Sequence, residues 1–355
     1  MSAPTVSVVV VNFDGESYLP RMRDALLATE FPFFEIIVCD DVSRDGSRLW
    51  LRHEWPEARV QAAPRNSGCA AMRNLGLRVA RGDYVLLLDN DGLPERGCVH
   101  ALVAALSERP ACAAAMPRIV LRGTTALVQC DGAYTHPSGQ MGLATPHTPL
   151  GEAPLKAVPI TSVMGTAMLL RREAALRAGA FAEDFFIYYE DHEFGTRLVM
   201  LEGDVISVPE ARIDHLGGTK NLSFRTGQKY PDRRAFLIVR NRQRFMLRAL
   251  ECRTLFVLSP ILILHEFAQI AWSLLAGRIA HWCDASWDNM RQLARILNER
   301  HWIQQRRRLH DQALIRTGPL PVHPGLLTRP WQRELLLRFS ACLDRMYSTL
   351  SRFLA

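Results

Sequence analysis

Carboxylates follow three apolar segments in the first hundred residues, and they are Asp14, Asp40, Asp89 and Asp91. Mg²⁺ and Mn²⁺ prefer oxygen ligands and usually take one or two protein carboxylates together with substrate phosphates. Crowded negative charges repel one another, so a cation or a network of donors should accompany them. These residue types indicate a divalent metal site, although the DNDG of residues 89–92 is also typical of a tight turn.

A second acidic group, Glu190, Asp191 and Glu193, follows the aromatic run FFIYY of residues 185–189. Aromatic walls beside a carboxylate suit sugar recognition and can raise the pKa of the acid toward that of a useful general base. The alternative is structural, because acids at the start of a helix are favoured by the helix dipole.

Three further residues could bind a ligand. Arg73 offers a planar set of donors close to Gly68, where a helix begins, although it could equally be a surface arginine. Asp40 could accept hydrogen bonds from a base or ribose, whereas Asp41 or Ser43 could cap the next helix. His215 precedes two glycines, and a lone histidine is more often structural than a ligand.

The elements that would position these residues alternate between strands and helices. Expected strands cover residues 6–11, 35–40 and 84–89, and expected helices cover 68–79, 97–107 and 190–201. Such alternation predicts right-handed βαβ units and a mainly parallel sheet whose faces are both covered by helices. Parallel sheets bind ligands beyond the carboxyl ends of their strands, so the acids should share one rim. Residues 120–160 are predicted to form loops and short strands.

The eight cysteines form no CxxC pair, so a zinc site is not expected and a set of structural disulfides has no support. Dispersed thiols suit a reducing compartment. The apolar run at the N-terminus lacks a basic start and a small-residue cleavage site, and we interpret it as a strand.

Charge is unevenly distributed, with a formal net charge of +7. From Phe236 onward there are 18 Arg, no Lys and eight acids, and five of the seven tryptophans lie there. A basic, Trp-rich tail suggests an anionic partner, and charge alone fits either membrane lipid or nucleic acid.

Residues 255–276 are mostly apolar and long enough to span a bilayer, but Pro260 and Glu266 make a simple span costly. Tryptophan beside arginine at an apolar helix edge favours a helix lying at the lipid interface. The alternative is a buried helical subdomain with a solvated basic face.

Six segments occur in an order that resembles the family 2 glycosyltransferases, most closely the bacterial branch that includes rhamnosyltransferases. They are VSVVVVNFDGESYL, EIIVCDDVSRDGS, NSGCAAMRNLGLRVARGDYVLLLDND, GTAMLLRREAALRAGAF, FFIYYEDHEF and DHLGG, and the resemblance covers about residues 5 to 245. It implies an α/β fold of GT-A type, with a Rossmann-like, mainly parallel sheet, flanking helices and a C-terminal helical region. It also implies a nucleotide-diphospho-sugar donor, Mn²⁺ or Mg²⁺, and inversion at the anomeric carbon.

The resemblance also assigns residues. It implies nucleotide-sugar binding by Val11, Phe13, Asp14, Asp40, Arg73, Asn74, Asp89 and Asn90. It places the metal at Asp91 and His215, and the catalytic base at Asp191 with Glu190 beside it. Two departures concern His192 and Glu193, which replace the usual residues after the base, and Gly92, which replaces a frequent third acid.

We therefore expect an inverting glycosyltransferase that moves a sugar from dTDP-rhamnose or a UDP-sugar to a hydroxyl of a glycan or lipid-linked acceptor. Its domains would be a GT-A domain of residues 1–235 and a helical, membrane-associating region of residues 236–355. It would be cytoplasmic, bound to the anionic inner face of a bacterial membrane, with no nucleic-acid partner.

Two alternatives fit less well. A nucleotidyltransferase acting on sugar phosphates would need a Gly-rich, basic loop near the first strand, where no basic residue occurs before Arg21. A basic nucleic-acid-binding protein would leave the acidic rim unexplained.

Overall fold

The computed structural model describes residues 4–122, 126–217, 230–320, 322 and 329–354. The chain forms two compact units, residues 1–133 with 143–219 and residues 134–142 with 220–355. The first unit thus ends shortly before the domain boundary expected at residue 235. Gly218, at the end of the DHLGG segment, lies outside the described residues. The functional division into two domains stays a prediction.

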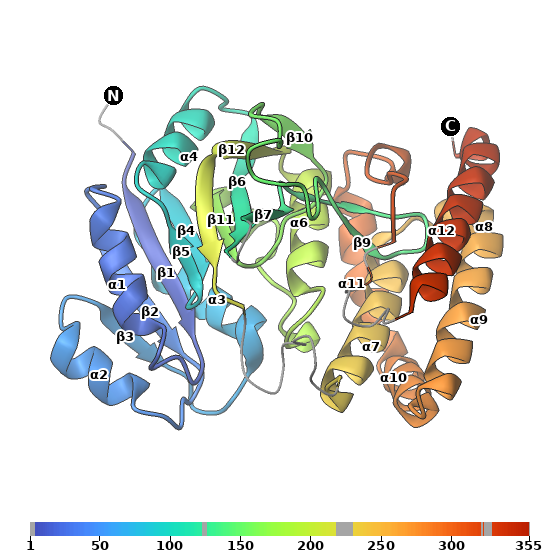
Figure 1. Ribbon diagram of the computed structural model, residues 1–355, viewed down its shortest axis with the longest axis horizontal. Coiled ribbons are helices and arrows are strands. Elements are labelled where there is room, and N and C mark those ends of the chain that lie inside the picture. Colours follow the sequence, from blue (N-terminus) through green and yellow to red (C-terminus); the bar gives the residue numbers. More distant parts are fainter. Residues whose placement is uncertain (1–3, 123–125, 218–229, 321, 323–328, 355) are drawn as a thin grey trace. The chain divides into compact units, whose positions relative to one another are not determined.

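A mixed ten-stranded sheet forms the centre of the first unit (Figure 1). Its strands are β1 (Val6–Asn12), β2 (Glu35–Asp40), β3 (Arg59–Ala62), β4 (Tyr84–Asp89), β5 (Gly92–Pro94), β6 (Cys112–Leu121), β7 (Leu127–Cys130), β10 (Val158–Ile160), β11 (Ala167–Arg171) and β12 (Asp204–His215). The main order is β10-β12-β6-β11-β4-β1-β2-β3, with β5 beside β12 and β7 beside β6. The short strands β8 (Ala133–Thr135) and β9 (Met141–Leu143) pair separately.

The parallel part of the sheet consists of β3, β2, β1 and β4. Every residue of β1 is buried, and β4 is buried up to Asp89, which agrees with strands covered on both faces. The register pairs Asn12 of β1 with Asp40 of β2, and Val11 of β1 with Asp89 of β4. These strand ends therefore lie at one rim, as the sequence predicts.

Beyond β4 the sheet is mixed, because β11 runs antiparallel to both β4 and β6. The expected α/β fold of GT-A type is confirmed, but the parallel arrangement is limited to β3-β2-β1-β4 and to the pair β6-β12. An antiparallel neighbour needs no helical crossover, so alternation of strands and helices does not predict it. The short strands of residues 120–160 have too little periodicity to be located from sequence.

The helices of the first unit are α1 (Leu19–Ala28), α2 (Ser47–Glu54), α3 (Gly68–Val79), α4 (Cys98–Ser107), α5 (Arg172–Arg177) and α6 (Glu190–Leu201). α3 packs against β1 and β2, and α4 packs against β6 and β12. The bounds predicted for α3 and α6 are confirmed. Asp41 accepts hydrogen bonds from the N–H groups of Ser67 and Gly68, so it holds the start of α3, whereas α2 begins at Ser47 with no side-chain cap.

Helices dominate the second unit: α7 (Asp232–Ala249), α8 (Cys252–Val257), α9 (Ser259–Leu275), α10 (Ile279–Arg291), α11 (Leu293–Arg306) and α12 (Pro330–Leu350). Leu258 and Ile261 pack with Leu343 and Tyr347 of α12 in an apolar core. The apolar stretch of residues 255–276 is divided at Leu258, between α8 and α9. Within the described ranges, no helix combines the length and the apolar character needed to cross a membrane.

Candidate active site

The side chain of Asn12, at the end of β1, forms hydrogen bonds to the end of β2 and to the loops that follow β2 and β4. Its Nδ2 donates to Asp40 Oδ2 at 2.9 Å and to Ser43 Oγ at 3.1 Å. Its Oδ1 accepts a hydrogen bond from Asn90 Nδ2 at 2.9 Å. Asn12 and Asp40 are fully buried, so this network holds the ends of β1 and β2 and the loop after β4 in fixed relation.

Asp40 lies beneath the loop that follows β2. The N–H of Ser43 donates to Asp40 Oδ1 at 3.1 Å, and the Ser43 hydroxyl donates to Oδ2 at 2.6 Å. Ser43 Oγ in turn accepts the N–H of Asp14, whose carboxylate accepts the N–H of Arg44. The loops after β1 and β2 are therefore joined, with Asp14 exposed and Phe13 half-buried at the rim.

The side chains of Asp91 and His215 lie next to each other, and the metal binding that the resemblance implies for them stays a prediction. His215 Nε2 lies 3.3 Å from Asp91 Oδ2, and Nδ1 lies 2.6 Å from Oε1 of Gln129. An amide oxygen can only accept, so Nδ1 carries the proton there, and Nε2 of the neutral ring points a lone pair at a carboxylate. His215 Nε2 and Asp91 Oδ2 are then two facing acceptors, which could bind one cation between them. The alternative is a second proton on the His215 ring, at Nε2. Burial lowers the pKa of His215, but the hydrogen bond and charge of Asp91 outweigh this and raise it.

Among the residues that the structure describes, no group of three or more His, Cys, Asp and Glu side chains could hold a metal ion. Asp91 and His215 could thus supply two ligands, and substrate phosphates and water would have to supply the others. This partial set is typical of Mg²⁺ and Mn²⁺ sites that bind nucleotide phosphates.

Arg73 occupies the centre of the other half of the site, with only 2% of its side chain exposed. Nη1 donates to Glu190 Oε1 at 2.6 Å, and Nη2 donates to Asp89 Oδ1 at 2.7 Å and to the carbonyl of Gly165 at 3.0 Å. A buried guanidinium requires partners of this kind. Arg73 thus joins β4, the segment before β11 and the start of α6.

Asp191 is the second residue of α6 and is half-buried. Its Oδ2 accepts the N–H of Gly165 at 2.7 Å, and its Oδ1 accepts the N–H of His192 at 2.7 Å. Burial and the charge of Glu190 raise the pKa of Asp191 to about 7, against the opposing charge of Arg73 and the two backbone donors. A carboxylate with this pKa is suited to accept a proton near neutral pH.

The backbone that leads into Glu190 is strained. Phe186, Tyr188 and Tyr189 have φ values of 66°, 68° and 67°, which are uncommon for bulky residues. Phe186 is the centre of a γ-turn, in which the N–H of Ile187 donates to the carbonyl of Phe185 at 2.8 Å. Each such conformation costs on the order of 1–3 kcal/mol and clusters at functional sites.

The remaining predicted residues lie elsewhere around the rim. Asn74 exchanges hydrogen bonds with the backbone of Phe181 and donates to Glu183, so its amide holds the loop before α6. Val11 is buried in β1. Nucleotide contacts by Asn74 and Val11 stay predictions.

Sequence reasoning missed two residues of the site. Gly165 touches both Arg73 and Asp191, and an added Cβ at Gly165 would lie 2.6 Å from Arg73 Nη2. Gln129 orients His215 from β7. A glycine two residues before a strand is a weak local signal. Gln129 has no local signal at all, because its partner His215 is 86 residues away in the sequence.

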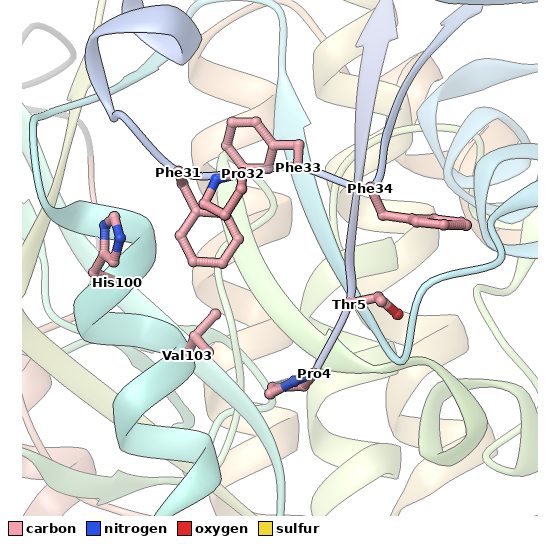
Figure 2. Close-up of a pocket in the computed structure, with 8 residues that line it drawn as sticks. All are labelled: Pro4, Thr5, Phe31, Pro32, Phe33, Phe34, His100 and Val103. Atoms are coloured by element: carbon pink, nitrogen blue, oxygen red, sulfur yellow. The ribbon is translucent and has the colours of Figure 1, made fainter. Parts of the chain in front are cut away.

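An aromatic pocket of about 540 Å³ lies at the opposite end of β1 (Figure 2). It is lined by Pro4, Thr5, Phe31, Pro32, Phe33, Phe34, His100 and Val103. Thr5 precedes β1, whereas the carboxylates follow β1, β2 and β4. The hydroxyl of Thr5 is already bonded to Asp83. This pocket is therefore separate from the acidic rim.

Comparison with known proteins finds a family match for the part of the chain that carries β1, β2 and β4. The family described as Glycosyl transferase family 2 matches residues 7–176. A Bacillus subtilis protein named as a teichuronic acid biosynthesis glycosyltransferase, TuaG, is 34% identical over 91 residues, which are 25% of this chain and 36% of TuaG. The matched part thus spans little more than a third of that relative.

Solved structures share the fold at low identity. A GalNAc-T7 structure with UDP, GalNAc and Mn²⁺ has a TM-score of 0.55 and 17% identity, covering 71% of this chain and 49% of that one. A structure of residues 1–349 of Staphylococcus aureus TarS with UDP-GlcNAc has a TM-score of 0.54 and 16% identity. The match covers 97% of this chain and 92% of that one. Residues 7–176, a little under half of the chain, match the family 2 glycosyltransferases, and the relatives and solved structures above support that match.

Proposed function

We propose that this chain is an inverting glycosyltransferase that moves a sugar from a nucleotide-diphospho-sugar to a hydroxyl of a glycan or lipid-linked acceptor. The observation that carries the proposal is the hydrogen bond between Asp191 and Gly165, because Gly165 also bonds Arg73, the partner of Asp89. Through Gly165 and Arg73, Asp191, whose pKa is about 7, is linked to Asp89 at the end of β4, on the side of the site where the donor would bind.

The reaction is a single displacement in which Asp191 acts as general base. Asp191 accepts the proton of the acceptor hydroxyl, and that oxygen forms a bond to the anomeric carbon. The bond from the anomeric carbon to the diphosphate oxygen breaks on the opposite face, which inverts the configuration. His192, whose pKa burial lowers to about 3, stays neutral beside the base. General base catalysis of this type contributes about 10²- to 10⁴-fold in rate.

Asp91 and His215 would hold Mn²⁺ or Mg²⁺ at the diphosphate end of the donor. When bound, the cation supplies positive charge that stabilises the departing nucleoside diphosphate. Gln129 fixes the ring of His215 for this role. Asp89 and Asn90 would contact ribose and sugar, and Asp40 the nucleoside.

The donor is proposed to be a UDP-sugar or dTDP-rhamnose. The solved GalNAc-T7 and TarS structures hold UDP and UDP-GlcNAc, which supports a uridine donor through shared fold alone. The test is a hydrolysis and transfer screen of purified protein against sugar nucleotides, with Mn²⁺, with Mg²⁺ and with EDTA. Turnover of one donor with metal supports the proposal, and no turnover of any donor contradicts it.

The acceptor is proposed to lie at an anionic membrane surface, cytoplasmic and bacterial, on which the second unit docks. Phe256, Ile263, Phe267, Leu274 and Leu275 are exposed and form what we call the apolar stripe of α8 and α9. Within α9, Ile263, Phe267 and Leu274 are spaced by 4 and 7 residues, which places them on one face of the helix. The opposite face carries Leu258 and Ile261 of the core.

Charge favours lipid as the occupant of the apolar stripe. Arg253, one turn before Phe256, donates to the carbonyl of Phe353 at 3.0 Å, and the Arg352 guanidinium lies 5.2 Å from the centre of the exposed Phe353 ring. Glu266 is the one acid in residues 256–275, and it bonds Arg242 of α7. Apolar side chains beside arginines suit anionic headgroups.

A further inference from the structure

Arg73 bridges carboxylates from two different parts of the site. It lies on α3, Asp89 is the last residue of β4, and Glu190 is the first residue of α6. The guanidinium directs its two terminal nitrogens at the two carboxylates, a planar geometry that lysine cannot reproduce. One buried side chain thus fixes the distance between the donor side of the rim and the helix that carries Asp191.

Backbone contacts reinforce this bridge on both sides. Gly165 accepts from Arg73 through its carbonyl and donates to Asp191 through its N–H. At the other end of the strained turn, a Cβ on Gly68, where φ is 85°, would collide with the carbonyl oxygen of Phe186. The turn before Glu190 is therefore held against α3 at Phe186 and again at Glu190.

We propose that Arg73 is a positioning residue for sugar transfer, which holds Asp89 and the start of α6 in the arrangement that brings Asp191 to the donor. This inference rests on the proposed function and adds a role that the resemblance does not imply, since the resemblance places Arg73 near the nucleoside. Arg73 acts through Asp89, Glu190 and Gly165, with all of which it forms hydrogen bonds.

The charges around Asp191 give the proposal a specific signature. Glu190 on its own helix raises the pKa of Asp191, and Arg73 on α3 lowers it. The thiols of Cys69 and Cys130 also face this region, and burial raises the pKa of both so that they stay neutral near pH 7. Removing the charge of Arg73 should therefore raise the pKa of Asp191, and removing the charge of Glu190 should lower it.

The experiment measures kcat and KM for the donor from pH 5 to pH 9 in wild type, Arg73→Met, Arg73→Lys and Glu190→Gln. Arg78→Met is the control, because Arg78 lies on the same helix, is 57% exposed and pairs with the exposed Glu183. We expect Arg73→Met to lower kcat about 100-fold, as misplacement by about 1 Å can do, with a much smaller change in KM. Arg73→Lys should recover part of the rate, and Arg78→Met should match wild type.

In the same data, the acidic limb of the kcat/KM profile should move to higher pH in Arg73→Met and to lower pH in Glu190→Gln. Wild-type kcat in Arg73→Met, or limbs that do not move in opposite directions, would overturn the proposal. If Arg73→Met does not fold, Glu190→Gln still decides, because an unchanged limb in that variant also overturns it. Absence of turnover in wild type would instead reject the proposed function.

Discussion

His215 Nε2 lies 3.3 Å from Asp91 Oδ2, where the end of β12 runs beside the loop after β4. The antiparallel pairing of His215 with Gly92 brings the two side chains together, and Gln129 holds the far nitrogen of the ring. A carboxylate and a ring nitrogen in this arrangement can share one divalent cation, with diphosphate oxygens completing its coordination.

Asp91→Asn should raise the Mn²⁺ concentration needed for half-maximal donor turnover by at least about 10-fold. Loss of an outer partner of a metal ligand costs about 10- to 100-fold, so loss of a ligand should cost no less. The measurement is turnover against Mn²⁺ concentration, with the exposed Asp24→Asn as control. An unchanged Mn²⁺ dependence in Asp91→Asn would remove this residue from the metal site.

The raised pKa of Asp191 also predicts a pH dependence of stability. The folded protein binds this proton more tightly than the unfolded chain, so the contribution to stability is present below the ordinary Asp pKa and is lost as pH rises through about 7. The Asn side chain of Asp191→Asn does not titrate, so this variant does not lose stability in that pH range through this group. The unfolding free energy of the variant relative to wild type should therefore increase from pH 5 to pH 8 in urea titrations. A difference that is constant with pH would contradict the assignment.

Asn12→Ala should lower the free energy of unfolding by about 1–3 kcal/mol, because it leaves buried groups on Asp40 and Asn90 without this partner. It should also weaken donor binding, since the ends of β1 and β2 and the loop after β4 lose their shared contact. Urea unfolding and a donor titration measure the two effects. Leu49→Ser, at an exposed position, is the control. Unchanged stability would show that Asn12 does not hold the rim.

Replacing Phe256 and Phe267 together by Ser should remove binding to phosphatidylglycerol-containing vesicles. Full burial of one such side chain is worth roughly 1.5–3 kcal/mol, so the double variant should bind at least about 10-fold more weakly. The measurement is vesicle sedimentation at low salt, with pure phosphatidylcholine vesicles and Leu49→Ser as controls. Equal sedimentation of variant and wild type, or a wild-type dimer that the variant dissociates, would contradict the membrane assignment.

The acidic rim could be predicted from sequence because its signals are local. Buried strands ending in Asp40 and Asp89 are visible as apolar runs followed by acids, and parallel strands bring such ends to one edge. Likewise, α3 and α6 have clear helical spacing, so their bounds follow from sequence.

The connections across the site could not be predicted in this way. Arg73 looks like a possible surface residue of α3, and only the packing of the segment before β11 and of the start of α6 against it reveals Gly165 and Glu190 as its partners. The antiparallel direction of β11 could not be predicted from the alternation of strands and helices along the chain. Gln129 lies in a segment with no periodicity, so its contact with His215 depends wholly on tertiary structure.

Sugar transfer by Asp191→Asn, compared with wild type at saturating donor and Mn²⁺, tests the central claim most directly. The substitution keeps the shape and removes the base, so donor binding should be retained while kcat falls by about 10²- to 10⁴-fold. Transfer at close to the wild-type rate would mean that Asp191 does not accept the acceptor proton.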